Sequence, residues 1–294
     1  MMSMKRSFEQ ANSNIPQKKQ RLSAQPANFR GAGSQAKAFD YVKTHGGVVI
    51  GRDDGRAKQF YVCTDWDHVY DFVFSQDKEQ QNFYELIREN TPAKLVIDLD
   101  LKPEQLQSAE VLEETMDTIQ AKTIRVTLAK LSQAGVQVAE RNIQVYHSDG
   151  PNKASRHILF PAWFTNIRPS MHGFAKQHLY PSLGKRGFDM SIYTKNRHMR
   201  FFGNTKIGSN RRLHIKGRPL KPGTDAHREA FMKSRVQEPP PDNMTWIHSG
   251  LNFGDVKGSS KVSQAEQALI SDFTLGRIAE ESLSYLDQLK AYVL

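Results

Sequence analysis

The sequence predicts a mixed fold of the α/β (α+β) class. Segments with the two-residue period of strands are interleaved with segments whose apolar residues recur at three- and four-residue steps, as in amphipathic helices. Of the 294 residues, 38% are hydrophobic and 24% are charged, which allows a buried core under a charged surface. This length accommodates one large domain or two modest ones.

Composition excludes two classes of protein. No apolar run approaches the ~18 residues that span a membrane, so we expect no membrane partner. The single cysteine, Cys63, rules out a disulfide framework and a multi-cysteine zinc finger within this chain, and it fits a reducing compartment.

Positive charge is concentrated in two parts of the chain. The formal net charge is +10, of which residues 1–30 carry +5 and residues 184–218 carry +9. The rest of the chain is therefore net acidic. Such clustering is typical of proteins that bind polyanions, and the alternative is a solvated basic surface.

Residues 1–30 are predicted to form a disordered basic tail, because they are rich in Gln, Asn, Ser and Lys and poor in large apolar residues. Two basic clusters in this tail are separated by eleven residues, as in a bipartite nuclear-import signal. Their members are Lys5, Arg6, Lys18, Lys19 and Arg21. We therefore expect the protein in the nucleus; a generic nucleic-acid-binding arm is the alternative.

Two predicted modules follow the tail. The first, residues 31–93, is an αβ module with helices predicted at 34–45 and 65–74 and strands predicted at 48–50 and 59–63. The second, residues 94–235, has strands predicted at 94–101, 142–147, 154–160 and 199–203 and a long helix at about 104–133. We expect this second module to carry the chemistry.

The C-terminal region is set apart by a Pro-rich break at residues 238–242. Residues 236–262 are predicted to be a linker, and residues 263–294 are predicted to form an amphipathic helix with a Leu/Ile stripe. We expect this helix either to bind a partner, such as a helicase or another replication protein, or to dock on the core of its own chain.

The strand at residues 94–101 carries the first candidate site. Because side chains alternate between the two faces of a strand, its apolar residues share one face, and Asp98 and Asp100 share the other, roughly 6.5–7 Å apart. Two carboxylates this close repel each other unless a cation neutralises them, and Mg²⁺ or Mn²⁺ does so with oxygen ligands. Two solvated aspartates at a strand end are the alternative.

Residues 153–158 follow the same alternation. Lys153, Ser155 and His157 share one face, whereas Ala154 and Ile158 point the other way. A cation, a hydroxyl and an imidazole in a row offer three donors for phosphate oxygens. An edge strand with polar residues facing water is the alternative.

A third cluster spans residues 189–206. Asp189 precedes a run of cations and aromatic residues that includes Arg197, Arg200 and Lys206. Such a mixture suits a triphosphate, or a nucleic-acid backbone with stacked bases.

In this order, an Asp-x-Asp strand, a Ser-x-His strand and a late Asp resemble the motifs of the archaeo-eukaryotic primase superfamily. Within it, the chain is similar to eukaryotic primase-polymerase and to the primases of large DNA viruses and herpesviruses. The similarity lies at residues 35–39, 84–101, 193–200 and 205–208, and it covers roughly residues 33–215. It implies an archaeo-eukaryotic primase fold, in which an N-terminal αβ module precedes an RRM-like catalytic module.

The resemblance also implies roles for individual residues. Asp98, Asp100 and Asp189 match the catalytic carboxylates that bind Mg²⁺ or Mn²⁺. The residues that match nucleotide-binding positions are Lys153, Ser155, His157, Arg197, Arg200 and Lys206.

The activity implied by the resemblance is that of a DNA-directed primase/polymerase. Such a nucleotidyltransferase joins nucleoside triphosphates on single-stranded or primed DNA by a two-metal mechanism, in replication priming or damage tolerance. This sequence departs from the family in two ways: the insertion between the second and third motifs is almost absent, and the zinc module of eukaryotic and herpesvirus members has no counterpart, since Cys63 stands alone. The second departure favours polymerisation over unassisted initiation of primers.

Two other kinds of protein stay open at this point. A metal-dependent or rolling-circle-type nuclease can share a small αβ core, but it would need a nucleophile such as Tyr beside a His pair, and the sequence contains no His-x-His. A non-catalytic DNA-binding replication accessory protein would need only the basic clusters.

Overall fold

The structure is a computed structural model that describes residues 25–237, except 56, 90, 108 and 109, together with residue 247. The predicted nuclear-import residues, most of the predicted linker and the predicted C-terminal helix lie outside the described residues. The chain divides into two compact units. Of the described residues, unit 1 comprises 25–86 and His198–Arg235, and unit 2 comprises Ile87–Arg197 together with Val236, Gln237 and Ile247.

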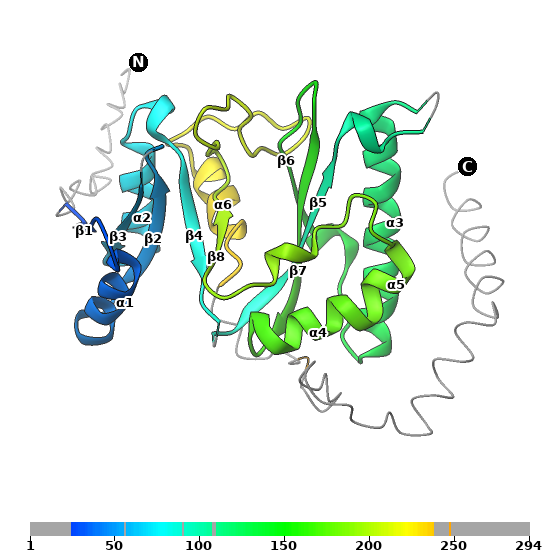
Figure 1. Cartoon of the computed structure of the whole chain (residues 1–294), viewed down its shortest axis with the longest axis horizontal. Coiled ribbons are helices and arrows are strands. Elements are labelled where there is room, and N and C mark those ends of the chain that lie inside the picture. The colour runs from blue at the N-terminus through cyan, green and yellow to red at the C-terminus, as the bar shows by residue number, and fades with distance from the viewer. Residues whose placement is uncertain (1–24, 56, 90, 108–109, 238–246, 248–294) are drawn as a thin grey trace, which may run out of the picture. The chain divides into compact units, whose positions relative to one another are not determined.

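Unit 1 is built around a five-stranded sheet with the strand order β1-β3-β2-β4-β8 (Figure 1). Its strands are β1 (Ala27–Phe29), β2 (Val48–Asp53), β3 (Lys58–Cys63), β4 (Phe83–Ile87) and β8 (Arg197–Arg200). β3 pairs antiparallel with β1 and β2, and β2 pairs antiparallel with β4. Helix α1 (Ser34–His45) covers part of this sheet, because its Ala38 packs in a buried cluster with Val49, Phe60, Val62 and Leu86.

Two further helices of unit 1, α2 (Trp66–Phe74) and α6 (Asp225–Lys233), begin at side-chain caps. The Asp65 carboxylate accepts a hydrogen bond from the His68 N–H at 2.7 Å, and the Thr224 hydroxyl accepts one from the His227 N–H at 3.3 Å. The helices are joined by Tyr70, whose hydroxyl lies 3.0 Å from Nδ1 of His227. These contacts attach α6 to a helix that is far away in the sequence.

Unit 2 contains a three-stranded antiparallel sheet with the order β5-β7-β6. Its strands are β5 (Ala93–Leu101), β6 (Gln144–His147) and β7 (Ala154–Phe164), and the long helix α3 (Leu112–Gln133) connects β5 to β6. The chain thus makes a split β-α-β unit, in which β7 is inserted between the two strands that the helix connects. β7 is the central strand of this sheet, and β5 is also buried, since its side chains from Leu95 to Ile97 have no exposed surface.

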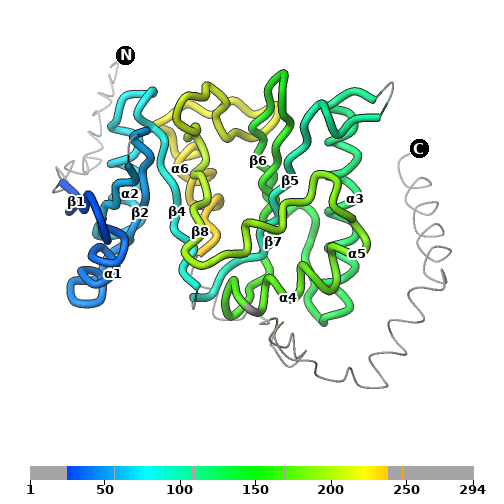
Figure 2. The backbone as a smooth tube through the Cα atoms, viewed as in Figure 1, coloured from blue at the N-terminus to red at the C-terminus, as the bar shows by residue number. Residues whose placement is uncertain are grey.

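A second helical region of unit 2 covers residues 167–183. It consists of α4 (His172–Phe174) and α5 (Tyr180–Leu183). A π-helical turn at Ala175–Leu179 precedes α5, and the segment Ile167–Met171 before α4 is interrupted by the extended backbone of Arg168. Figure 2 shows the backbone of α5 beside that of α3, and the two helices are in contact. Among the described residues, no helix combines the length and the apolar character needed to cross a membrane.

The mixed α+β class is confirmed, with helices and two antiparallel sheets, but the predicted start of the long helix is wrong. This helix begins at Leu112 and not near Glu104. The Glu110 carboxylate accepts a hydrogen bond from the Gln107 N–H at 2.6 Å and pairs with Arg186. These side-chain bonds compete with the helical backbone hydrogen bonds that Gln107 and Glu110 would otherwise make.

Three other boundaries differ from the prediction. The predicted disordered tail ends too late, because Ala27–Phe29 form β1, which pairs with β3. The strand predicted at 199–203 is β8, Arg197–Arg200, because the chain turns away at residues 202–203. Residues 198–235, which the sequence assigns to the second module, group with the N-terminal part in unit 1. The physical reason is that β8 pairs with β4 and that α6 packs against α2.

Candidate metal and phosphate site

The register between β5 and β7 aligns two of the predicted motifs. Asp98 is the pairing partner of His157, and Asp100 is the partner of Ser155. Paired residues of neighbouring strands project to the same face of a sheet, so these four side chains share one face. The two sequence motifs therefore form one surface within unit 2.

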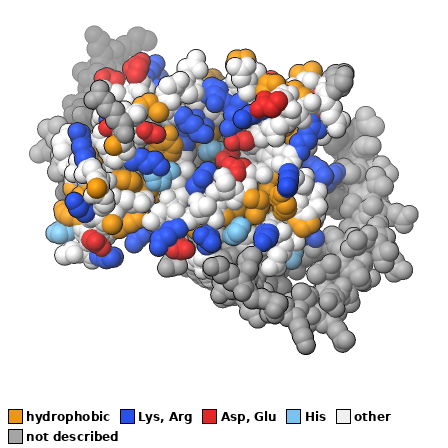
Figure 3. Space-filling model, in the orientation of Figure 1, with side chains coloured by type: hydrophobic (Ala, Val, Ile, Leu, Met, Phe, Trp, Pro, Cys, Tyr) orange, Lys and Arg blue, Asp and Glu red, His pale blue; other side chains and the backbone are white. Residues whose placement is uncertain are grey.

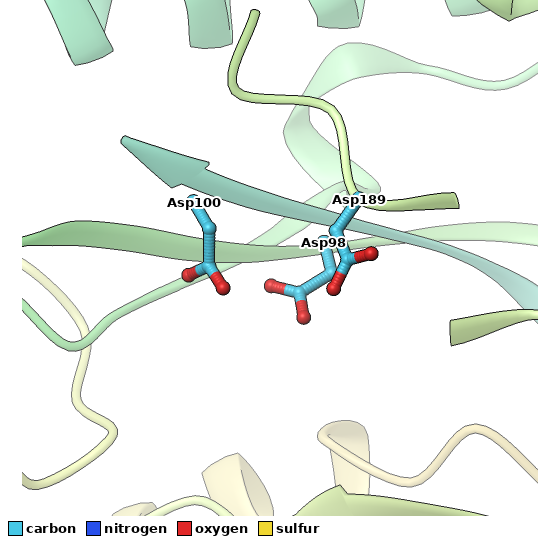
Figure 4. A group of neighbouring side chains, drawn as sticks. All are labelled: Asp98, Asp100 and Asp189. Carbon is cyan, nitrogen blue, oxygen red and sulfur yellow. The ribbon is translucent and has the colours of Figure 1, made fainter. Parts of the chain in front are cut away.

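The carboxylates of Asp98, Asp100 and Asp189 converge in unit 2 (Figure 4). One oxygen from each lies within 4.8 Å of the others. Mg²⁺ and Mn²⁺ bind oxygen ligands at about 2.0–2.3 Å, so the ligands of one ion are up to about 4–5 Å apart. The donor chemistry and the spacing therefore fit a divalent metal ion.

Asp189 is brought to this cluster by backbone pairing along the other edge of β5. Its N–H donates to the carbonyl oxygen of Asp98 at 3.0 Å, and the N–H of Asp100 donates to the carbonyl of Gly187 at 2.8 Å. Leu99 and Phe188 form an antiparallel bridge between these two bonds. The segment thus acts as a short extra strand that places Asp189 beside Asp98. The spacing of the two residues in the sequence does not indicate this proximity.

Tyr193 fixes the chain that follows Asp189. Its hydroxyl donates to the carbonyl oxygen of Val96 at 2.9 Å, and its side chain is 2% exposed. Burial raises the pKa of Tyr193 well above the usual range, and the charges of Asp98 and Asp189 raise it further, so the phenol stays neutral and remains a donor. Sequence reasoning missed this role, which a tyrosine four residues after a candidate ligand could have suggested.

Two basic side chains from β7 and its turn border the carboxylates. Lys153 Nζ lies 2.6 Å from an Asp100 carboxylate oxygen, and Nε2 of His157 lies 3.7 Å from a carboxylate oxygen of Asp98. Ser155 lies between them on the same face and is buried. Lys153 therefore supplies a positive charge at the place where a metal ion would interact with Asp100.

The opposite face of β7 carries a buried guanidinium that sequence reasoning missed. Arg156 has no exposed surface, and its Nη2 donates to Asp117 of α3 at 2.9 Å. Its Nε donates to Gln120 at 3.1 Å, and its Nη1 bonds Asp149 of the β6–β7 turn. Two carboxylates thus neutralise one buried cation, as the cost of burying a charge requires.

Asp149 links this network to the strand that carries Ser155. Its Oδ1 accepts a hydrogen bond from the Ser155 N–H at 3.0 Å, and its Oδ2 lies 3.5 Å from Nδ1 of His147. Burial raises the pKa of Asp149, but hydrogen bonds and charge from His147, Arg156 and the Ser155 N–H lower it by more, so the net pKa is lowered. The turn before the strand that carries Ser155 and His157 is therefore held by an ionised carboxylate.

The remaining predicted phosphate ligands are divided between the units. Arg197 is in unit 2, where its Nη1 donates to the carbonyl oxygen of Ser191 at 3.3 Å. Arg200 and Lys206 are in unit 1, where Arg200 Nη1 donates to the carbonyl oxygen of Arg211 at 2.8 Å. Within unit 2 the structure groups the carboxylates with Lys153, Ser155 and His157, and the roles of Arg200 and Lys206 stay predictions.

One interpretation of the third cluster needs correction. Its aromatic residues were expected to offer faces for stacked bases, but Tyr193, Phe201 and Phe202 are all buried, with at most 3% exposure. They are core residues of their units; Thr194 and Lys195 are the exposed residues between them, whereas Arg200 is buried as well.

The fold and this site define a mixed α+β protein with a carboxylate cluster that can hold a divalent metal ion beside candidate phosphate-binding side chains. A scan against models of protein families finds none that matches the chain, and a search of curated proteins finds no similar sequence. Membership of the primase superfamily therefore rests on the motifs and stays a prediction.

Proposed function

We propose that the protein is a DNA-directed primase/polymerase, a metal-dependent nucleotidyltransferase of the archaeo-eukaryotic primase type. One observation carries the proposal: the strand with Asp98 and Asp100 pairs in register with the strand that presents Ser155 and His157. Carboxylates for metal ions and donors for phosphate groups thus lie side by side, as phosphoryl transfer requires.

The topology of unit 2 supports this proposal. An RRM-like module begins with a β-α-β-β unit whose third strand lies between the first two, which is the arrangement of β5, α3, β6 and β7. The segment at Gly187–Asp189 runs along the free edge of β5, where the fourth strand of such a sheet lies. With unit 1 as the N-terminal αβ part, this arrangement favours the primase fold.

In the proposed reaction, Asp98, Asp100 and Asp189 would hold two Mg²⁺ or Mn²⁺ ions. Such ions supply activation of the attacking 3′-hydroxyl and charge stabilisation on the leaving pyrophosphate. Ser155 donates a hydrogen bond to the triphosphate of the incoming nucleotide, and His157 donates from Nε2 when the ring carries a proton there. Lys153, whose Nζ lies 2.6 Å from Asp100, would be available to the phosphates once a metal charge lay beside that carboxylate.

The proposed substrates are nucleoside triphosphates and single-stranded or primed DNA. The net charge of +10 supports binding to a polyanion, and Figure 3 shows Lys and Arg side chains spread over the described surface of the drawn face. A nuclear location, a role in replication priming or damage tolerance, and a helicase or other replication partner are parts of the same proposal.

A nucleotide-incorporation assay tests the proposal. The full chain is incubated with a labelled primer on a longer template, nucleoside triphosphates and Mg²⁺ or Mn²⁺, and we expect template-directed extension. Asp98→Asn should abolish extension, whereas Glu140→Gln, a neutralised exposed carboxylate of the same unit, should leave it unchanged. Shortening of the labelled strand would indicate the nuclease alternative. Binding with neither extension nor cleavage in either metal would refute the enzymatic proposal and favour the accessory protein.

A further inference from the structure

Unit 1 contains a groove of about 750 Å³ that is separate from the carboxylate cluster of unit 2. One wall is formed by the end of α2 and the segment up to Gln81, and the other by residues 202–222, with His227 of α6 at the base. All of these residues belong to unit 1. The volume is in the upper part of the range of about 300–1,000 Å³ that is usual for ligand sites.

The two walls are cross-linked, so the groove is preformed. Arg212 donates to the side-chain oxygen of Gln81 at 2.9 Å and to the carbonyl oxygen of Lys78 at 2.8 Å. Within the second wall, the N–H of Gly203 donates to the carbonyl oxygen of Leu213 at 2.8 Å. A Cβ on Gly203 would lie 3.0 Å from the Phe74 ring, so a larger residue would push the walls apart.

The rim of the groove is cationic. Lys78, His214 and Arg218 are exposed and line it, and Asp77 is the acidic residue among its lining. His227 at the base is neutral at physiological pH, because burial lowers its pKa to about 4. The positive charge therefore comes from lysine and arginine side chains, and it persists over the whole physiological pH range.

The interior of the groove is largely apolar. Phe74, Ile215 and Leu220 are half-buried and line it. The two side-chain amides of the lining are already engaged: Gln81 donates to the carbonyl oxygen of Gln76 at 2.9 Å and accepts from Arg212, and Gln76 donates to the carbonyl of Phe72 at 3.1 Å.

From the cationic rim and the apolar, preformed interior, we propose that this groove binds a segment of single-stranded nucleic acid without regard to its sequence. Bases rest on the apolar interior, and the phosphates beside them contact Lys78 and Arg218. This combination of apolar contact surface and positive charge is how proteins hold single strands of any sequence. The Gln76 and Gln81 side chains already bond to the protein, so we expect them not to select particular bases by hydrogen bonding.

The proposal deepens the proposed function, since it assigns the template strand to a surface of unit 1. It depends on no carboxylate of unit 2 and on no metal ion. Strand binding can therefore be measured with chelator present, and its failure is distinct from a failure of nucleotide incorporation.

The test is the affinity of the full chain for a labelled oligothymidylate, measured by fluorescence anisotropy in EDTA over a range of salt concentrations. Lys78→Gln/Arg218→Gln should weaken binding about tenfold, and the slope of log affinity against log salt should fall by about 1.4, because each phosphate contact on a single strand contributes about 0.7. Leu220→Ser should weaken binding with no change in that slope. The matched control Lys37→Gln/Lys58→Gln neutralises two exposed lysines elsewhere in unit 1 and should change neither quantity.

Thermal unfolding of each variant checks that the fold is retained, and Lys78→Gln alone, with an expected slope change of about 0.7, replaces the double variant if it is not. The proposal is overturned if the rim variant binds the oligonucleotide like the control. It is also overturned if the rim change weakens binding of a labelled nucleoside triphosphate while strand affinity stays the same, because the groove would then hold a free nucleotide.

Discussion

The two faces of β7 handle charge in opposite ways. On the face toward α3, one buried arginine, Arg156, is bonded by two carboxylates, Asp117 and Asp149. On the other face, the three carboxylates of the cluster converge, and the basic side chains of Lys153 and His157 lie in ion-pair contact with two of them. Neighbouring residues of one strand therefore take part in two different sites. Arg156 belongs to a charge-balanced ion network, and Ser155 and His157 face a cluster of carboxylates.

This difference indicates which charges serve the fold and which serve a ligand. A buried cation with two anions is balanced within the protein, and removing its partners leaves a charge that water does not reach. Clustered carboxylates repel each other, so their convergence costs stability that a bound metal ion restores. The same kind of substitution should therefore have opposite consequences on the two faces.

The largest expected effect is on activity. Asp98→Asn/Asp100→Asn should reduce nucleotide incorporation by about 10³-fold or more, since metal ions contribute several kcal/mol to the transition state. The free energy of unfolding, measured with urea in the absence of metal, should stay within about 1 kcal/mol or rise, because repulsion is removed. A large loss of stability would mean that these carboxylates belong to the fold.

Neutralising two carboxylates on the face toward α3 should lower stability. Asp117→Asn/Asp149→Asn leaves Arg156 buried without an ionised partner, and we expect a loss of about 3–5 kcal/mol in the free energy of unfolding. Adding Arg156→Met should restore most of this loss, because a neutral side chain of similar length fills the space. If the double variant is as stable as the original chain, Arg156 is not held as the structure indicates.

The pH dependence of stability should separate Asp149 from the cluster. Its pKa is lowered in the folded state, so its ionised form stabilises the protein above the ordinary value of 3.8, and that contribution disappears as pH falls through the lower folded value. Asp149→Asn should cost about 1–3 kcal/mol at pH 7. Urea unfolding should show that the difference in the free energy of unfolding between the original chain and Asp149→Asn shrinks below about pH 4. A difference that is constant down to pH 3 would contradict the lowered pKa of Asp149.

The smallest expected effect concerns Lys153. Lys153→Met should raise the affinity for Mn²⁺ about three- to tenfold, because a charge that competes for Asp100 is removed, and a nearby charge near the surface is worth about 1 kcal/mol or more. The KM for the nucleotide should rise at the same time. Lys122→Met, on an exposed position of α3, is the control for both measurements, which are Mn²⁺ titration and steady-state kinetics. A drop in Mn²⁺ affinity would contradict this account.

Much of the site could be predicted from local periodicity. The alternation of Asp98 with Asp100, and of Ser155 with His157, depends only on the two-residue period of a strand, and the register of β5 with β7 places them together. Asp189 could be found only from the motif resemblance, because long-range backbone bonds to β5 bring it there. No local pattern in residues 184–189 indicates such an edge.

Arg156 shows where sequence reasoning fails. Alternation places it on the apolar face with Ala154 and Ile158, where a charged residue is not expected, and its partners lie on a helix and in a turn. The start of α3 was missed for a related reason, since hydrogen bonds of the Glu110 side chain outweigh the helical tendency of the preceding residues. Both the burial of Arg156 and the start of α3 depend on side chains that are distant in the sequence.

The nesting of the units has a consequence for how the chain is made. Unit 1 begins at the N-terminus but receives β8 and α6 only after all of unit 2 up to Arg197 has been synthesised. Until then, β4 is an open edge of the unit 1 sheet on the growing chain, and open edges invite pairing with the wrong strand. Unit 1 therefore stays incomplete until residues 198–235 have left the ribosome, whereas every strand of the unit 2 sheet has been synthesised by then.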